Sequence, residues 1–502
     1  MPPARRRVLV LGLDGGTFDL LDPLMRNGTL PFLRSLTERG LRAPLASVYP
    51  PKTIPAWYSF ATGLDPGSLG IFGFTEPDGG PGKSRIVQSF RPAEAVWDHL
   101  SRRGIAVGVM NFPLRAGYPI HGFVLPGMLT ENPPTYPAGL RASLEESLGE
   151  PILPELPAYR GTDRASWMEL ATHGVEQRGH SAELLCTQYK PEFLFVLFRE
   201  TDRIQHQHWT ELAGGSGPVG ADLVAFWKAI DAACEKIDRA FRAAGGPAVT
   251  LVISDHGHGP AQADFFTNRW LAQEGYLVFK NGGAGGRRRT VSRLLLASEK
   301  FPPTRWVVHA IADRLRGRSG REKIAKFLAG EASFESMAER IDWDRTTAYS
   351  YPVPEGIYLN RYNRSMSADL NARVVAEIRQ KLAAFPDARV ETYAPGEIYA
   401  GRLLDQAPAV LLKIDDLGTE PRMDFSYPEP MLRDRPGFFY GSGVHRMNGI
   451  LIAAGEGVPP RTETTPRSLL DIAPTILETM DVPVPPAWNG RSFASLLAPA
   501  AA

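Results

Sequence analysis

Four short runs of apolar residues constrain the fold of this 502-residue chain more than any other feature. The runs are apolar throughout instead of alternating, as expected for strands buried on both faces of a parallel sheet. Helical patterns lie between them, so the sequence predicts an α/β sandwich with a mostly parallel central sheet flanked by helices. The runs are Val8 to Leu13, Ile105 to Met110, Phe193 to Phe198 and Val249 to Ile253.

Helical periodicity is clearest before the last of these strands, where apolar residues recur every three or four positions between Leu223 and Phe241. Pro31 to Arg39 begins with a proline suited to a first turn and ends before Gly40. Towards the carboxyl end we expect the core to resume. The elements predicted there are a helix at Ala368 to Phe385, strands at Val410 to Ile414 and Gly449 to Ala454, and a closing helix at Ser468 to Met480 that Pro474 kinks or splits.

Charge and cysteine content exclude several classes of protein. Fifty-six Lys and Arg residues against 55 Asp and Glu give a formal charge of +1, which does not predict a nucleic-acid partner. Two cysteines, Cys186 and Cys234, are too few for a disulfide framework or a thiolate metal cluster. No apolar run is long enough to cross a bilayer, and we therefore expect a soluble, cytoplasmic protein. Neither the charge nor the composition favours a particular oligomeric state.

One segment differs from the rest of the chain. Between Lys280 and Lys326 there are 13 Lys and Arg residues against three acids, and the glycine-rich stretch Asn281 to Gly286 opens this part. We expect residues 280–339 to form a basic, mostly helical insertion or cap, and residues 1–279 and 340–502 to form the core. A solvated helical face is the favoured interpretation of the basic charge; a surface that attracts substrate or a membrane is the alternative.

Acidic residues and histidines follow three of the predicted strands, and function gathers at the carboxyl edge of such sheets. Asp14 ends the first strand, Asp202 and His206 follow the third, and Asp255 with His256 follows the fourth. Each alone could be a loop acid or a helix cap. Together they suit a metal site, because the four-residue spacing of Asp202 and His206 places both on one helical face.

Three further histidines carry weaker signals. We expect His208 and His258 to lie outside the metal shell or at the surface, and His445 is a lone histidine in a glycine-flanked loop. Thr53 stands at the start of a predicted helix that ends at Gly63. A helix cap is the simpler interpretation of Thr53; the alternative is a nucleophile whose alkoxide the positive helix end stabilises.

These motifs together resemble the type I phosphodiesterase/nucleotide pyrophosphatase family of the alkaline phosphatase superfamily. The ordered set is LGLDGG, PPKTIPAWYSFATGLDP, TDRIQHQHW, SDHGHG, SGVHRMNG and LDIAPTILETMDVPVP with NGRSF, from about residue 8 to about residue 493. The resemblance implies an alkaline-phosphatase-like three-layer sandwich and two divalent ions, usually zinc, with manganese as an alternative. It implies that Thr53 is the nucleophile and completes one metal shell with Asp14, Asp255 and His256. The other ion would take Asp202, His206 and His445.

The resemblance also implies the reaction. Thr53 would attack the phosphorus of a small-molecule phosphate diester or nucleotide pyrophosphate, and a phospho-threonine intermediate would then be hydrolysed. A phosphomonoesterase of the same superfamily is the first alternative, and a non-catalytic metal-stabilised binding protein is the second. Sulfatases are disfavoured because Thr53 to Trp57 lacks both their modifiable residue and their arginine. Phe74 stands near the position where nucleotide pyrophosphatases often have an asparagine, so the pattern does not fix a nucleotide substrate.

Overall fold

A computed structural model describes residues 5–127, 129–153, 155–159, 163–214, 219–280, 333–425, 429–433 and 441–498. Its largest element is a nine-stranded sheet with the order β19-β2-β18-β8-β1-β7-β5-β6, in which β20 also pairs with β2. All neighbouring pairs in this sheet are parallel except those that β18 makes with β2 and β8. The strands are β1 (Arg7–Leu13), β2 (Leu41–Ala46), β5 (Val107–Pro113), β6 (Gly122–Gly127), β7 (Phe193–Phe198), β8 (Ala248–Ile253), β18 (Asn448–Gly455), β19 (Arg461–Thr462) and β20 (Arg467–Ser468).

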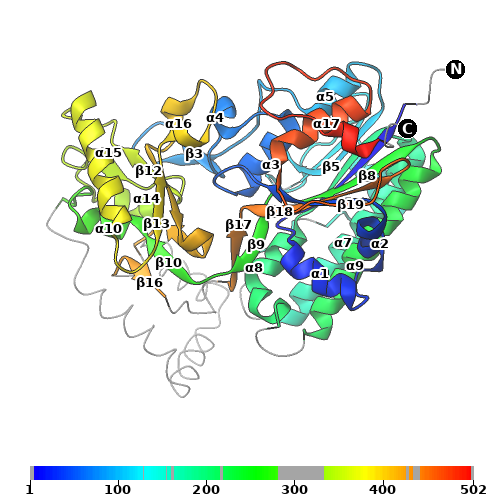
Figure 1. Cartoon of the computed structure of the whole chain (residues 1–502), viewed down its shortest axis with the longest axis horizontal. Coiled ribbons are helices and arrows are strands. Elements are labelled where there is room, and N and C mark those ends of the chain that lie inside the picture. Colours follow the sequence, from blue (N-terminus) through cyan, green and yellow to red (C-terminus); the bar gives the residue numbers. More distant parts are fainter. Residues whose placement is uncertain are drawn as a thin grey trace.

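Helices cover both faces of this sheet, which explains why its central strands are buried along their whole length (Figure 1). One face packs against α3 (Thr53–Thr62), α5 (Val96–Ser101) and α17 (Ile472–Thr479). The other packs against α1 (Phe18–Arg26), α2 (Pro31–Arg39), α6 (Leu140–Leu148), α7 (Arg164–Tyr189), α8 (Glu200–Leu212) and α9 (Ala221–Ala243). The predicted three-layer α/β sandwich with a mostly parallel sheet is confirmed.

A smaller lobe stands beside the sandwich, at the left of Figure 1, and has its own apolar core. It holds the sheets β15-β10-β16 and β11-β12-β14-β13. Its strands are β10 (Ala263–Phe266), β11 (Ala348–Tyr349), β12 (Gly356–Leu359), β13 (Val390–Tyr393), β14 (Val410–Ile414), β15 (Thr419–Arg422) and β16 (Met431–Leu432). Its helices are α10 (Thr267–Gln273), α14 (Phe334–Ala338), α15 (Ala368–Ala383) and α16 (Pro395–Ile398).

Short elements complete the described chain. The hairpin β3 (Thr75–Pro77) and β4 (Ser84–Ile86) follows the four-residue helix α4 (Pro66–Leu69). Strand β9 (Gly257–Pro260) pairs antiparallel with β17 (Gly443–Arg446). Single turns of 3-10 helix lie at Leu404–Gln406, Asp415–Leu417, Leu469–Asp471 and Ala494–Leu497.

Two of the sequence predictions need correction. Val410 to Ile414 is a strand, as predicted, but it pairs with β12 and β13 in the smaller lobe and does not return to the central sheet. The closing helix is divided: a 3-10 turn at Leu469–Asp471 precedes α17, and Pro474 lies in the first turn of α17, where its missing N–H removes no helical hydrogen bond.

The predicted basic insertion falls mostly outside the described residues, since residues 281–332 are not among them. Within the rest of the predicted segment, Phe334 and Met337 of α14 are buried in the apolar core of the smaller lobe. Among the described helices, none is both long and apolar enough to cross a membrane.

Candidate metal centre

The order of strands β18-β8-β1-β7 brings the candidate residues together at one edge of the central sheet. Asp14 directly follows β1, Asp255 and His256 follow β8, and Asp202 lies in the first turn of the helix after β7. Because these three strands are parallel neighbours, their carboxyl ends meet at the same edge. His445 arrives from β17, which pairs with the strand that continues from His256.

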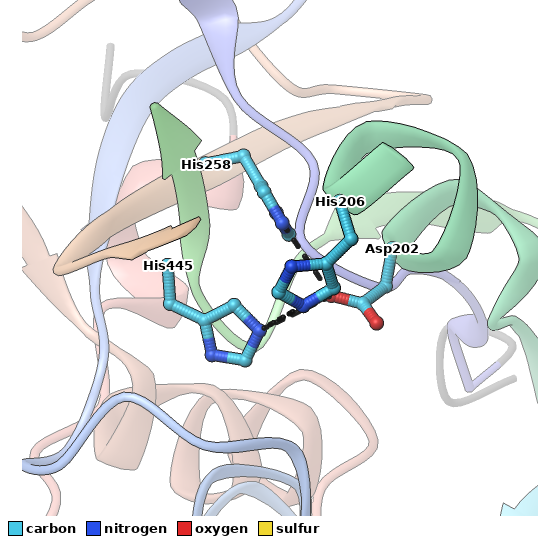
Figure 2. Close-up of side chains that lie close together, drawn as sticks. All are labelled: Asp202, His206, His258 and His445. Atoms are coloured by element: carbon cyan, nitrogen blue, oxygen red, sulfur yellow. Dashed lines mark hydrogen bonds and ion pairs between the residues drawn. The ribbon is translucent and has the colours of Figure 1, made fainter. Parts of the chain in front are cut away.

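Asp202, His206 and His445 form one group (Figure 2). The carboxylate oxygen Oδ1 of Asp202 lies 3.3 Å from Nε2 of His206 and 3.3 Å from Nε2 of His445. Each ring is oriented by a main-chain carbonyl: Nδ1–H of His206 donates to Gly443 at 2.9 Å, and Nδ1–H of His445 donates to Pro51 at 2.7 Å. Both Nε2 atoms therefore present lone pairs to the same point.

Those two lone pairs are the clearest sign that this group suits a cation. Nε2 of His206 lies only 2.9 Å from Nε2 of His445. Two neutral rings held in this tautomer repel one another, because neither nitrogen has a hydrogen to share. A proton or a metal ion between them and Asp202 removes that repulsion, and imidazole with carboxylate is a donor set that Zn²⁺ accepts.

Asp14, Asp255 and His256 form the adjoining group, and all three are fully buried. Nε2 of His256 lies 3.6 Å from Oδ1 of Asp14 and 3.3 Å from Oδ2 of Asp255. These three atoms are buried without a hydrogen-bond partner, as is Oδ1 of Asp202. Unpartnered buried carboxylate and imidazole atoms are costly, so the chemistry of this donor set also fits a cation.

The pKa values of the three carboxyls in the cluster also favour a bound cation. Burial and the neighbouring Asp202 raise the pKa of Asp14 to about 7. Burial and Asp14 raise the pKa of Asp255 well above its usual range. Burial alone would raise the pKa of Asp202, but contacts with His206 and His445 hold the pKa of this carboxyl well below its usual range. Without a cation, the carboxyls nearest His256 therefore resist ionisation.

Two residues that the sequence did not single out for this role hold Asp14 in place. Nε1–H of Trp57 donates to Oδ2 of Asp14 at 3.1 Å, and the guanidinium of Arg199 lies 3.7 Å from the same oxygen. Trp57 is fully buried. Arg199 carries no sequence signal, because an arginine after a strand is common and its partner lies 185 positions earlier in the chain.

Thr53 lies at the start of α3, the helix that Trp57 joins to Asp14. It is the first helical residue and not the cap: the capping position is Lys52, whose backbone is extended and whose side chain makes no cap hydrogen bond. The interpretation of Thr53 as a helix cap is therefore wrong, since its hydroxyl stands one position past the cap. Gly63 ends the helix in the left-handed conformation, with φ of 64°, as predicted.

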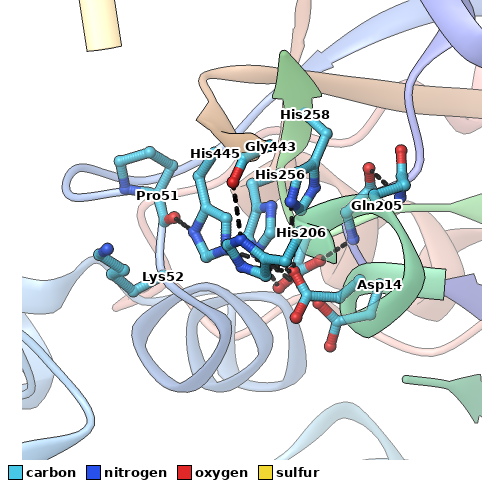
Figure 3. A network of polar contacts seen from close by, with 12 residues as sticks. Asp14, Pro51, Lys52, Gln205, His206, His256, His258, Gly443 and His445 are labelled. Carbon is cyan, nitrogen blue, oxygen red and sulfur yellow. Dashed lines mark hydrogen bonds and ion pairs between the residues drawn. The ribbon is translucent and has the colours of Figure 1, made fainter. Parts of the chain in front are cut away.

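Residues on either side of Thr53 contact candidate ligands, among them Pro51 at His445 (Figure 3). The carbonyl of Pro51 accepts the hydrogen bond from His445, and Trp57, one turn further along α3, donates to Asp14. Lys52 pairs with Glu355 of the smaller lobe, with 2.8 Å between Nζ and Oε1. The amino end of α3 is thus tied to both groups and to the smaller lobe.

The two histidines expected to lie outside the metal shell differ in position. His208 packs against Tyr159 and Trp167, with its ring tilted by 52° to each of theirs, and is not among the clustered donors. His258 is fully buried among the candidate ligands, 3.7 Å from Oδ1 of Asp202. Its position depends on the pairing of β9 with β17, a contact between distant segments that a sequence pattern does not reveal.

Comparison with known proteins relates this chain to a protein family and to solved structures. The sequence model of the type I phosphodiesterase / nucleotide pyrophosphatase family matches residues 8–418, which include every candidate residue named above for the two groups except His445. A crystal structure of phosphonoacetate hydrolase from Sinorhizobium meliloti 1021, in complex with phosphonoformate, has a similar fold, with a TM-score of 0.54 and 14% identity over 95% of this chain and 96% of that chain. No curated protein matches the sequence.

Proposed function

The chain belongs to the type I phosphodiesterase / nucleotide pyrophosphatase family, and on that premise we propose that it hydrolyses small-molecule phosphate diesters or nucleotide pyrophosphates. We propose Thr53 as the nucleophile. Two divalent cations, zinc with manganese as the alternative, complete the site. Asp14, Asp255 and His256, with the hydroxyl of Thr53, would hold one cation, while Asp202, His206 and His445 would hold the other.

One observation carries this proposal: buried carboxylate and imidazole atoms without partners converge at the sheet edge, beside the amino end of a helix that begins with Thr53. Main-chain N–H groups at such a helix end attract anions, and the helix dipole favours negative charge there. The hydroxyl of Thr53 and the phosphoryl group of a substrate would both lie in this field.

The reaction proceeds in two displacements at phosphorus. In the first, the hydroxyl oxygen of Thr53 forms a bond to phosphorus while the bond to the leaving group breaks, and the proton of the hydroxyl passes to the departing oxygen. In the second, the oxygen of a water molecule displaces Thr53 and regenerates the free hydroxyl. When bound, divalent cations promote loss of protons from hydroxyl and water and neutralise charge on the oxygens around phosphorus.

Neighbouring residues of the chain orient the candidate ligands. Gly443 and Pro51 fix the rings of His206 and His445 so that only one nitrogen of each faces the site. Trp57 and Arg199 both contact Oδ2 of Asp14 and hold that carboxyl in place. These contacts hold the donors in one arrangement before substrate binds, which reduces the reorganisation that the reaction requires.

The test uses the full-length protein with Zn²⁺ or Mn²⁺ on bis-p-nitrophenyl phosphate and on p-nitrophenyl phosphate. We expect chelator-sensitive release of p-nitrophenol mainly from the diester. Release mainly from the monoester would identify a phosphomonoesterase with the same residues. No release from either compound, in protein that binds the cations, would favour a non-catalytic binding protein and contradict the proposal.

A further inference from the structure

His258 is the one described histidine that lies inside the cluster without a role in the proposed function. It lies on β9 directly opposite His445 on β17. Its ring centre is 4.6 Å from that of His206 and 5.1 Å from that of His445 (Figure 2). Nε2 of His258 lies 3.7 Å from Oδ1 of Asp202, the oxygen that both other rings approach.

The hydrogen bonds of His258 differ from those of its neighbours. His206, His256 and His445 each have Nδ1 within hydrogen-bond distance of a main-chain carbonyl, which leaves Nε2 for the site. In His258 both ring nitrogens are buried and neither has a hydrogen-bond partner. A buried polar atom without a partner is unfavourable, so packing alone does not account for a histidine at this position.

Trp209 and Gly15 leave space for the ring of His258 and fix its position. Trp209 stacks on it, with ring centres 6.2 Å apart and 25° between the planes. On another side lies Gly15, whose φ is +67° and where an added Cβ would come within 2.5 Å of Nδ1 of His258. Any side chain at position 15 would overlap the space that the ring of His258 occupies. Glycine at this position therefore keeps His258 close to the other donors.

We propose that His258 is a fourth protein ligand of the cation held by Asp202, His206 and His445. One donor atom from each of these four residues lies within 4.8 Å of the others. Four protein donors are the number that closed, structural zinc sites use, and three are usual where a position stays open. We therefore expect this site to keep its cation when a chelator removes the one held by Asp14, Asp255, His256 and the hydroxyl of Thr53, because a neutral hydroxyl there takes the place of an imidazole donor here.

This inference rests on the proposed function only in assuming that the cluster binds divalent cations. The test compares the full-length protein with the variants His258→Gln and His180→Gln; His180 is an exposed histidine on α7 and serves as the matched control. Zinc content and competition with a chromophoric chelator are measured, together with the visible spectrum of the Co²⁺-substituted proteins.

We expect the wild-type protein and His180→Gln to bind two zinc ions and to lose them in two steps. In His258→Gln the affinity of the more tightly held ion should fall at least about tenfold, and the Co²⁺ spectrum should change because one nitrogen donor is lost. A variant that keeps wild-type affinity and spectrum would overturn the inference while leaving the proposed function intact.

A second measurement uses the wild-type protein and so does not depend on folding of the variant. The wild-type protein is crystallised with zinc, and the zinc ions are located by anomalous scattering. We expect a nitrogen of His258 about 2.0–2.1 Å from the metal. A separation of more than about 3 Å from a zinc ion bound to His206 and His445 would overturn the inference, because such a distance is far beyond a zinc–nitrogen bond. Failure of the wild-type protein to bind any cation would instead contradict the proposed function.

Discussion

At the scale of single residues, the proposed function depends on the hydroxyl of Thr53. Replacing it with Ala removes the nucleophile but little volume, so we expect diester hydrolysis to fall by at least roughly a thousandfold while cation content and thermal stability stay near wild type. Thr53→Ser keeps a hydroxyl and is the matched control, with measurable turnover expected. Steady-state rates on bis-p-nitrophenyl phosphate check this, and near wild-type turnover by Thr53→Ala would disprove the assignment.

The raised pKa of Asp14 gives a second residue-scale prediction, for the metal-free protein. Its pKa is about 7 in the folded state and about 3.9 in an unfolded chain, so folding favours the protonated carboxyl. The stabilising contribution of Asp14 is therefore complete below pH ~4 and is lost as the pH rises through 7. Asp14→Asn does not titrate, and we expect the wild type to lose up to about 1.4 kcal/mol per pH unit relative to this variant between pH 5 and 7.

Urea unfolding in excess chelator at pH 5, 6, 7 and 8 measures this difference. Asp19→Asn, at an exposed position in α1, controls for the removal of one negative charge. Curves for the wild type and Asp14→Asn that stay parallel across this range would show that Asp14 ionises normally in the fold.

At the scale of elements, strand β18 must approach the turn that carries Asp255 and His256. An added Cβ at Gly449 would lie 2.0 Å from Oγ of Ser254 and 2.9 Å from the carbonyl oxygen of His256. Ser254 cannot move aside freely, because its hydroxyl donates to the carbonyl of Gly16 and accepts from the main-chain N–H of Ile450. This close approach fixes the position of the turn that carries the candidate ligands Asp255 and His256.

We therefore expect Gly449→Ala to cost about 1–3 kcal/mol of stability and to weaken zinc binding, since the substitution overpacks a rigid site. The matched control is Gly396→Ala in α16, where an added Cβ meets no atom within 4 Å. Thermal unfolding and zinc content of both variants test this prediction. A Gly449→Ala protein with wild-type zinc affinity would show that β18 adjusts without moving the turn.

At the scale of the whole molecule, an ion pair joins the smaller lobe to the sandwich at the amino end of α3. Lys52 precedes Thr53, and its partner Glu355 lies just before β12. Side-chain exposure is 18% for Lys52 and 4% for Glu355, so removal of one partner leaves a largely desolvated charge. The lobe thus contributes directly to the position of the candidate nucleophile.

Glu355→Gln should lower the free energy of unfolding by about 3 kcal/mol and reduce diester turnover as Lys52 loses its partner. The control is Glu38→Gln, whose exposed pair with Arg34 should contribute less than about 1 kcal/mol. Denaturant unfolding and steady-state kinetics measure both effects. Equal stability of the two variants would mean that the lobe is held by other contacts.

Several features of this protein were determined by local sequence. Runs that are apolar at every position form β1, β7 and β8 because only a strand covered on both faces buries all of their side chains. The four-residue spacing of Asp202 and His206 places both on one face of α8 for an equally local reason. Strand ends, helix faces and the stop at Gly63 could therefore be predicted, and so could most of the candidate ligands.

Only the tertiary structure decided which of these pieces became neighbours. The lateral order of strands, the transfer of Val410 to Ile414 to the smaller lobe and the pairing of β9 with β17 depend on contacts between distant segments, whose side chains carry no local pattern. For that reason His258, Arg199 and Glu355 appear beside the candidate site only in the folded chain. Local periodicity specifies the faces of an element, whereas packing among all elements specifies what each face meets.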